Sequence, residues 1–463
     1  MDVKSTNPSI ASNAPDSSSS ADFAGRASVV DEAALISDGS WAIVNMPSES
    51  TKLVQLNKDS KVLMGKFGSF QASLLMGLPF DLPYEADGQG VVTPAPQGFN
   101  LDEFDIETEE GANNKNLVDK SDSQKLTQAE IEALKEKARK GDLEGLGVIK
   151  ALTENSETWK EKTEFAKAKY IKRKQKKYSR IFTPVRPTAR LLCEHFNREN
   201  PRRILEIRGD TLSQILTAAN VRAGGRYLLV DEAGGILTCA LAERMQGWGT
   251  IMMLHEHPAS NHDMIKYLNF PATVPDVMRT LSWNRIEPHT DEDINNTEMK
   301  TADPERSQRY HARIKKIKAS REYLKAGGFD ALIIVSLFDP KEIIEMLSPY
   351  LAGSAPIVAY SQYKEALTDA WQHMRTAREY VNSQLTESWL REYQVTGGMH
   401  PTMRMSGTGG YLVSGIKVFE VESHASTRPR AAGKGQGKGR RKRDDGDDGG
   451  EDRGADKAMK LDE

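Results

Sequence analysis

The stretch ILEIRGDTLSQILTAANVRAGGRYLLVDEAGG, from Ile204 to Gly235, decides the fold. Two short apolar runs, 204–207 and 227–230, flank an amphipathic segment that begins near Thr211. Buried apolar strands that alternate with amphipathic helices are typical of a mainly parallel sheet covered on both faces. The stretch therefore predicts the beginning of a nucleotide-binding α/β domain.

The same alternation continues downstream. Further strands are expected at 250–254, 331–335 and 357–360, and further helices are expected to begin near Gly235, Lys341 and Lys364. After the last helix, WLREYQV and YLVSGIKVFEV predict two strands with no helix between them. A parallel sheet that ends in an antiparallel hairpin is the layout of class I methyltransferases, a Rossmann-type fold.

The turn after the first expected strand lacks the glycines of a nucleotide site. Such a turn is glycine-rich because only glycine lets the backbone approach the ligand. Against the methyltransferase pattern E-x-G-x-G-x-G, Glu206 is retained, but Arg208, Asp210 and Leu212 occupy the glycine positions. These side chains fill or repel the space of S-adenosylmethionine. The sequence predicts that the cofactor site is lost and that Asp210 or Thr211 caps the next helix.

Other polar residues give weaker indications of chemistry. Asp231 and Glu232 end the second expected strand, where an acid can hold ribose hydroxyls. Asp339 is expected to be a helix N-cap rather than a catalyst. A histidine-rich cluster lacks the i, i+4 pair of an H-E-x-x-H zinc site; it consists of His255, Glu256, His257 and His262. No catalytic, cofactor-binding or metal-ligating residue is predicted.

Composition limits the class of protein. A chain of 463 residues has room for two or three domains. Its 63 Lys and Arg against 66 Asp and Glu give a net charge of -3, so nucleic-acid binding must depend on local patches. Two cysteines exclude a disulfide scaffold and suit a reducing compartment. Without a run of about 20 apolar residues or a signal peptide, we expect a soluble intracellular protein that does not contact membranes.

Shifts in composition and turn signals divide the chain into six segments. The N-terminal runs WAIV, KLVQL and KVLMGKF suggest a small β-barrel, and Thr127 with Glu130 forms a capping box that begins a helical segment. The expected segments are a disordered tail at 1–36, a β-barrel core at 37–80, an acidic flexible insert at 81–124, a helical basic segment at 125–180, a degenerate methyltransferase-like domain at 181–424, and a disordered charged tail at 425–463.

The basic segment contains a helix expected from Ser156 to about Lys177. Its nine Lys and Arg are interleaved with aromatic residues, and acidic residues nearly vanish after Glu164. A solvated charged helix is one interpretation, and a phosphate-binding helix is the one favoured here. Phosphate contacts would position an RNA without reading its sequence. The cations near Arg440 offer added RNA affinity or a nuclear import signal.

Several stretches resemble one family more specifically. They are ENSETWKEKTEFAKAKYIKRKQKKYSRIF, RRILEIRGDTLSQIL, LVDEAGGILTCALAERM, LHEHPASNHDMIKYLNFP and SWLREYQVTGGMHPTMRMSGTGGYLVSGIKV. From about Ser40 to Phe419 the chain resembles the non-catalytic, RNA-binding subunit of the eukaryotic tRNA (adenine-58-N1)-methyltransferase. The resemblance implies an N-terminal β-barrel and a methyltransferase-like domain without S-adenosylmethionine. It also implies a catalytic partner of the same fold that binds this cofactor, a two-plus-two heterotetramer, tRNA including initiator tRNA as the substrate, and a nuclear location.

The resemblance and the basic helix together nominate site residues. The expected tRNA contacts are Lys66, Lys160, Lys162, Lys167, Lys169, Lys172, Arg173, Lys174, Lys176, Lys177 and Tyr178. Arg391 and Arg404 are expected near the partner and its active site, with structural ion pairs as the alternative. The function implied is tRNA N1-methyladenosine formation, with this chain as the inactive subunit. The alternatives are an active methyltransferase with an atypical donor loop and an RNA-binding scaffold in translation initiation.

Overall fold

The computed structural model describes residues 34–86, 90–95, 124–140, 145–159, 162–257, 260–271, 274, 277–287, 304–395, 399–403, 405 and 407–419. The chain divides into two compact units, 1–419 and 420–463. The predicted charged tail, most of the N-terminal tail and much of the acidic insert lie outside the described residues.

An antiparallel sheet forms the N-terminal part of the fold. Its strand order is β2-β1-β7-β5-β6. Strands β3 and β4, which follow β2 in the sequence, pair in a separate two-stranded ribbon. The strands are β1 Ser40–Asn45, β2 Thr51–Leu56, β3 Lys61–Leu63, β4 Ser69–Gln71, β5 Tyr84–Ala86, β6 Val92–Pro94 and β7 Ile181–Val185. The rings of Phe70 and Phe182 stack in its core with centroids 4.5 Å apart.

The segment 81–124, predicted to be a flexible insert, contains β5 and β6. Tyr84 and Ala86 alternate inward and are both 1% exposed. Strands of three residues among acidic residues are too short to show a period-2 pattern. The acidic composition therefore masked two strands of the sheet.

Three helices follow: α2 Gln128–Lys140, α3 Gly145–Glu154 and α4 Glu164–Tyr178. The predicted capping box is confirmed, because Glu130 N donates to Thr127 Oγ1 (3.3 Å) and Thr127 N donates to Glu130 Oε2 (2.8 Å). The helix expected from Ser156 begins only at Glu164, with Thr163 as its N-cap.

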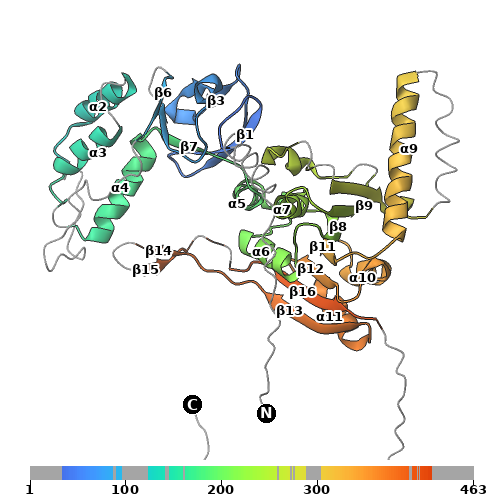
Figure 1. The fold of residues 1–463 in the computed structure, drawn as a ribbon. Coiled ribbons are helices and arrows are strands. Elements are labelled where there is room, and N and C mark those ends of the chain that lie inside the picture. The colour runs from blue at the N-terminus through green and yellow to red at the C-terminus, as the bar shows by residue number, and fades with distance from the viewer. Residues whose placement is uncertain are drawn as a thin grey trace, which may run out of the picture. The chain divides into compact units, whose positions relative to one another are not determined.

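A seven-stranded sheet forms the larger part of the fold, with the order β10-β9-β8-β11-β12-β16-β13 (Figure 1). The five strands from β10 to β12 are parallel, and β16 pairs antiparallel with both β12 and β13. The strands are β8 Arg226–Asp231, β9 Thr250–His255, β10 Met278–Ser282, β11 Ala331–Val335, β12 Pro356–Ser361, β13 Tyr380–Glu387 and β16 Tyr411–Lys417. The predicted Rossmann-type methyltransferase layout is confirmed.

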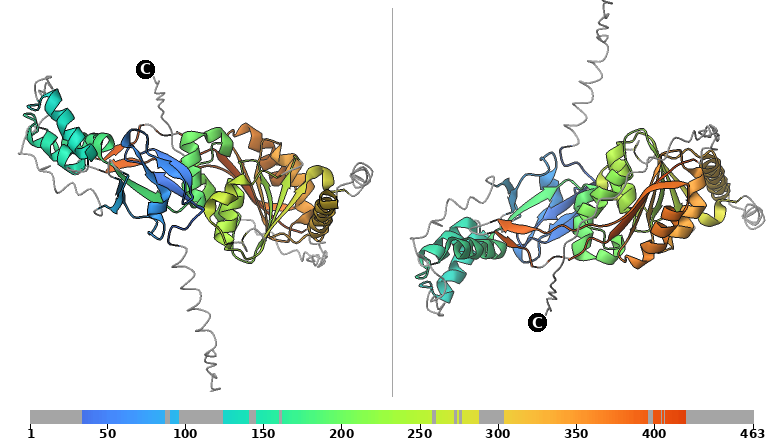
Figure 2. Two further views of the ribbon diagram at one scale, coloured as in Figure 1. Left: turned by 90° about the horizontal axis from the view of Figure 1, so that it is seen from above. Right: turned by 90° about the horizontal axis from the view of Figure 1, so that it is seen from below.

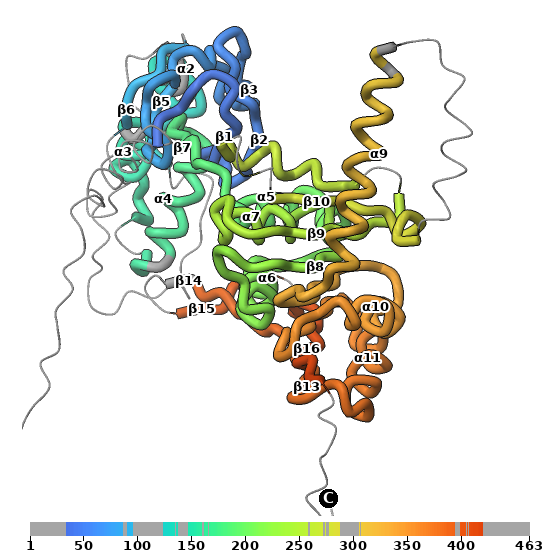
Figure 3. The backbone as a smooth tube through the Cα atoms, turned by 45° about the vertical axis from the view of Figure 1, so that its right-hand side comes forward, coloured from blue at the N-terminus to red at the C-terminus, as the bar shows by residue number. Residues whose placement is uncertain are grey.

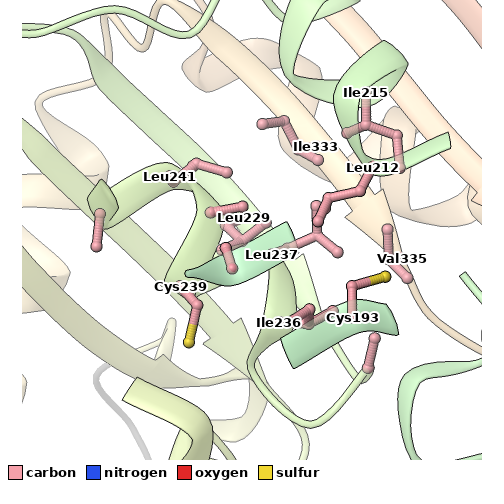
Figure 4. Packing of buried hydrophobic residues seen from close by; sticks show 14 of the residues in the cluster. Cys193, Leu212, Ile215, Leu229, Ile236, Leu237, Cys239, Leu241, Ile333 and Val335 are labelled. Carbon is pink, nitrogen blue, oxygen red and sulfur yellow. The ribbon is translucent and has the colours of Figure 1, made fainter. Parts of the chain in front are cut away.

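Helices cover both faces of this sheet (Figure 2). One face packs against α5 Ala189–Glu199, α6 Gly209–Ala218 and α7 Ile236–Met245. The other packs against α9 Pro304–Lys325, α10 Pro340–Leu347 and α11 Glu365–Thr376. Figure 4 shows Leu212 and Leu237 packed among side chains of the first face. Both cysteines are buried free thiols, and burial raises the pKa of Cys193 to about 12.

The first predicted strand is wrong. Residues Pro201–Ile204 form a 3-10 helix, and Leu205 and Glu206 take left-handed conformations with φ of 48° and 55°. The hydroxyl of Tyr360 on β12 donates to the Leu205 carbonyl (3.1 Å), which holds this turn against the sheet. Strand β10 was also missed in the sequence, because its apolar residues are interrupted by Arg279 and Thr280.

The predicted closing hairpin is also misplaced. The edge pair is β13 with β16, whereas WLREYQV contributes β14, Tyr393–Val395. Strand β14 pairs with β15, Met399–Pro401, in a separate two-stranded ribbon. The mostly polar β13 hides its strand character because one of its faces is open to solvent.

Candidate functional site

The strand order places the ligand site of this fold after β8. From β8 the chain moves to β9 and β10 on one side, and later to β11 and β12 on the other. Ligands of open α/β sheets bind outside the carboxyl ends of the strands at this reversal. The glycine turn of the fold therefore corresponds to 231–237, not to the turn at Arg208 that precedes α6. The location predicted for the overwritten loop was wrong.

The turn after β8 retains one glycine of the donor pattern. With Asp231 in the acidic position of E-x-G-x-G-x-G, the glycine positions hold Ala233, Gly235 and Leu237. The Asp231 carboxylate is 5% exposed and accepts from Ala233 N (3.0 Å), Thr238 N (2.9 Å) and Thr238 Oγ1 (2.9 Å). Burial raises the pKa of Asp231, and these hydrogen bonds oppose that shift. Asp231 therefore holds the turn together rather than a ribose.

The chain itself fills the space over the two glycines. A Cβ on Gly235 would lie 2.7 Å from the Cα of His262, and a Cβ on Gly234 would lie 2.8 Å from the Met264 Cε. A Cβ on Gly234 would also lie 3.1 Å from the Arg203 carbonyl oxygen. In nucleotide-binding domains, glycine in this turn lets the ligand come close to the backbone. Here the segment around His262 comes close to Gly235 instead.

Glu232 links the carboxyl ends of β8 and β11. Its backbone N–H donates to the Val335 carbonyl (2.9 Å), and its carboxylate accepts from Leu337 N (2.9 Å). The residues at this switch point therefore do not fit S-adenosylmethionine. The Gly234-Gly235 pair after an apolar run was the sequence signal that would have located the turn.

The Arg208 turn has a structural role instead. Arg208 is 9% exposed; its Nε donates to Asp210 Oδ1 (3.0 Å) and its Nη2 donates to Asp210 Oδ2 (2.9 Å). The same Nη2 donates to the Leu390 carbonyl (3.1 Å). The N-cap of α6 is Arg208, so the expected cap at Asp210 or Thr211 was wrong.

Thr211 extends these contacts to a distant segment. Its side chain is 0% exposed and its Oγ1 lies 2.7 Å from both Ser388 Oγ and the Gly409 carbonyl oxygen. Ser388 Oγ also donates to Asp210 Oδ2 (3.1 Å). Both ends of the segment 388–410, which we call the arm, are thus clamped to the start of α6.

The arm exposes large apolar side chains. The exposed fractions are 77% for Trp389, 51% for Leu390, 57% for Tyr393, 75% for Met399 and 79% for Met403. Exposed apolar side chains that gather on one segment are candidates for a protein contact. The exposed side chains beside and on the β14-β15 ribbon therefore make the arm a candidate contact surface.

The two predicted partner-side arginines both belong to the arm. Arg391 is exposed between Leu390 and Glu392, which are exposed as well. Arg404 lies outside the described residues.

Cations gather along one face of α4. Lys169, Lys172, Arg173, Lys176 and Lys177 recur at spacings of three and four residues, which place side chains on a common helix face. All are exposed except Lys176, which is half-buried. Lys172 and Lys176 both pair with Glu49 in the turn between β1 and β2; the Lys172 contact is 3.7 Å. Because exposed ion pairs are weak, this face stays available to a stronger anion.

The opposite side of α4 packs on aromatic rings. Lys167, one of the expected tRNA contacts, is 2% exposed, and its Nζ lies 5.8 Å from the Trp159 ring centroid. Its side chain is therefore buried and not open to contact with RNA. Lys162 and Lys174 lie over the Tyr170 ring at 5.3 and 4.9 Å.

The remaining predicted contacts lie apart from this face or at its end. Tyr178, the last residue of α4, is half-buried, with Lys177 5.4 Å from its ring centroid. Lys66 is exposed in the 3-10 helix Gly65–Phe67. Lys160 lies outside the described residues.

The histidine cluster is held by local contacts. His255 Nδ1 lies 2.5 Å from the His257 carbonyl oxygen and His262 Nδ1 lies 2.7 Å from Ser260 Oγ. Burial lowers the pKa of both His255 and His262. Among the described residues, no three histidine, cysteine or acidic side chains are grouped to hold a metal ion. Asp339 is the predicted N-cap, accepting from Lys341 N (2.8 Å).

Within the same described part of the chain, no helix is long and apolar enough to cross a membrane.

Comparisons with known proteins give a consistent result. Residues 35–311 match the Gcd10p family. A relative from Debaryomyces hansenii is 32% identical over 86% of this chain and 90% of its own length, and one from Mus musculus is 32% identical over 83% and 88%. Both are named tRNA (adenine(58)-N(1))-methyltransferase non-catalytic subunit TRM6.

Solved structures of methyltransferases are also similar. A SAM-dependent O-methyltransferase from Thermotoga maritima has a TM-score of 0.46 at 11% identity, covering 84% of this chain and 97% of that one. The tRNA (m1A58) methyltransferase TrmI from Aquifex aeolicus has a TM-score of 0.42 at 12% identity, covering 83% and 100%.

Proposed function

Because the chain belongs to the Gcd10p family, we propose that it is the non-catalytic subunit of a tRNA (adenine-58-N1)-methyltransferase. The observation that carries this function is the glycine turn after β8. There Gly235 packs against the His262 backbone of the same chain, so the close approach that this glycine permits is taken by protein. This packing supports the proposal that the chain binds no donor and that the chemistry belongs to a catalytic partner.

The role left to this chain is to hold the substrate. The exposed cations of α4 and Lys66 can neutralise phosphates of a tRNA, which fixes its position without reading its sequence. Holding the T-loop adenosine close to a bound donor lowers the barrier by proximity and orientation. We propose that tRNA, including initiator tRNA, is the ligand of this surface.

The partner is proposed to be a methyltransferase of the same fold that retains the glycine turn and binds S-adenosylmethionine. We place its contact on the arm, which exposes the side chains of Trp389, Met399 and Met403. Hydrogen bonds to Leu390 and Ser388 fasten the arm to the start of α6. Arg391, which is exposed on the same segment, would lie close to this contact. Two copies of each chain are expected in the complex.

A nuclear location completes the proposal. It is supported by the basic run GKGQGKGRRKR in the C-terminal tail. Deleting 433–443 in a fluorescent fusion is expected to shift the protein to the cytoplasm, and an unchanged distribution would remove this support.

The test is calorimetric titration of S-adenosylmethionine into the isolated chain, the isolated partner and the co-purified complex. We expect no heat of binding from the isolated chain and binding to the complex with one donor per partner chain. Methylation of tRNA at the T-loop adenosine should require both chains. Stoichiometric binding to the isolated chain would establish an active enzyme instead, and failure to co-purify with a methyltransferase would favour a scaffold.

A further inference from the structure

A second basic helix lies outside the surfaces described so far. Helix α9 carries eight Lys and Arg and two acids, Glu305 and Glu322, over 22 residues. Its cations are Arg306, Arg309, Arg313, Lys315, Lys316, Lys318, Arg321 and Lys325. The end of α9 nearer Pro304 extends past the sheet (Figures 1 and 3).

Three of these cations form a line along one side of the helix. Arg309, Arg313 and Lys316 are separated by four and three residues. Residues at these spacings are neighbours about 5–6 Å apart on a helix surface, so the line spans about 10 Å at 1.5 Å per residue. Arg309, Arg313 and Lys316 are exposed.

The other end of α9 is anchored firmly. Ser320, Arg321 and Leu324 are 5%, 7% and 0% exposed, and Arg321 Nε donates to the Arg285 carbonyl (2.7 Å). Tyr323 lies under the guanidinium groups of Arg226 (4.7 Å) and Arg279 (4.8 Å). A rigid base holds the projecting cations in place, which reduces the ordering cost of binding a ligand there.

The charge pattern is unfavourable for the helix by itself. Like charges three and four residues apart destabilise a helix, and cations near its N-terminus oppose the macrodipole. The Arg309–Glu305 pair (3.0 Å) has side chains 80% and 79% exposed, so this pair by itself contributes little. A bound polyanion would remove the repulsion.

We propose that the exposed part of α9 is a second binding surface for an RNA backbone, separate from α4. The inference rests on the proposed function, in which RNA is the polyanionic ligand of this chain. RNA is favoured over an acidic protein because α4 carries the same spacing of exposed cations. The tRNA is then held at two places on this chain, which restricts its rotation more than one contact does.

The test is tRNA binding by the whole complex with the triple variant R309Q/R313Q/K316Q, measured across a salt series. Glutamine keeps helix propensity close to that of arginine and lysine, so α9 should remain folded; circular dichroism checks this. The matched control is K58Q/K364Q/R378Q, which removes the same charge from exposed residues elsewhere.

We expect the α9 variant to weaken tRNA binding about tenfold near 0.1 M salt and to lower the salt slope by about two to three units, because each lost phosphate contact removes about 0.7–0.9 units. The control should change neither quantity to this extent. Unchanged binding by the α9 variant, or an equal change in the control, would overturn the inference. If an α4 variant still weakens binding in that case, the proposed function stands without the second surface.

Discussion

The hydroxyl of Thr211 lies 2.7 Å from the hydroxyl of Ser388, across 177 residues of sequence, and both side chains are buried. This contact explains why a polar turn follows the first segment of the domain. The turn does not replace a cofactor loop; it fastens the arm to α6.

Replacing Thr211 by Val should therefore loosen the arm. The substitution removes the hydroxyl contacts to Ser388 and to the Gly409 carbonyl, and the carbonyl loses its side-chain donor. We expect a loss of about 1–3 kcal/mol in the free energy of unfolding, measured by denaturant titration, and faster proteolysis within 388–410. Thr217→Val is the control, since Thr217 is exposed and bonds only within its own helix. Equal effects of the two substitutions would contradict the role of Thr211 in holding the arm against α6.

The exposed side chains of the arm should be needed for assembly. We expect the triple variant W389S/M399S/M403S to lose co-purification with the catalytic partner, because the apolar contact is removed. Replacing Leu63, Trp248 and Met346 by Ser removes comparable exposed apolar surface from other elements and should leave assembly intact. Size-exclusion chromatography with light scattering measures both, and retained assembly of the arm variant would locate the partner elsewhere.

Gly235 should be far less tolerant of a side chain than Gly224. Both have positive φ, 89° and 80°, so Ala at either position costs about 1–2 kcal/mol of backbone strain. At Gly235 the added Cβ also meets the His262 backbone, whereas at Gly224 no atom lies within 4 Å. We expect Gly235→Ala to cost about 1–3 kcal/mol more than Gly224→Ala. Equal stabilities of the two variants would mean that the space over the turn is open.

The α4 face should contribute several units to the salt dependence of tRNA binding. Replacing Lys169, Lys172, Arg173 and Lys177 by Gln should lower the slope by about three units. Glu49→Gln is expected to act in the opposite sense, strengthening binding, because it removes the carboxylate that competes for Lys172 and Lys176. A filter-binding salt series measures both variants, and unchanged slopes would remove α4 from the RNA surface.

His195 should make the fold sensitive to acid. Burial lowers its pKa below 6.5, and its Nδ1 lies 2.6 Å from Thr51 Oγ1 on β2. Below pH 6.5 the unfolded chain binds a proton that the folded chain does not, so this contribution to stability declines as pH falls toward the lowered pKa. One proton corresponds to a slope of at most about 1.4 kcal/mol per pH unit.

The variant His195→Gln should show a shallower loss of stability between pH 6.5 and 5 than the native chain. His311→Gln, at an exposed position, should keep the native pH profile. Denaturant midpoints at several pH values measure the difference. Identical profiles for the native chain and His195→Gln would show that other groups govern the acid response.

Local patterns in the sequence predicted much of the fold. The amphipathic helices around Leu212, Ile343 and Leu367 and the apolar strands β8, β9, β11 and β12 have periodicities that report which side chains are buried. The family resemblance added the function and the expected tRNA contacts. Strands β5, β6 and β10 were missed because they are short or interrupted, and packing with distant strands decides their conformation.

The sequence by itself determined the alternation of strands and helices and the basic character of α4, because these depend on residues near one another in the chain. Only the tertiary structure decided that β8 lies beside β11 and that the turn after β8 is the one at the switch point. It also decided that His262 fills this turn and that Thr211 holds Ser388. The physical reason is that strand order and close packing arise from contacts between segments far apart in sequence, which no local periodicity encodes.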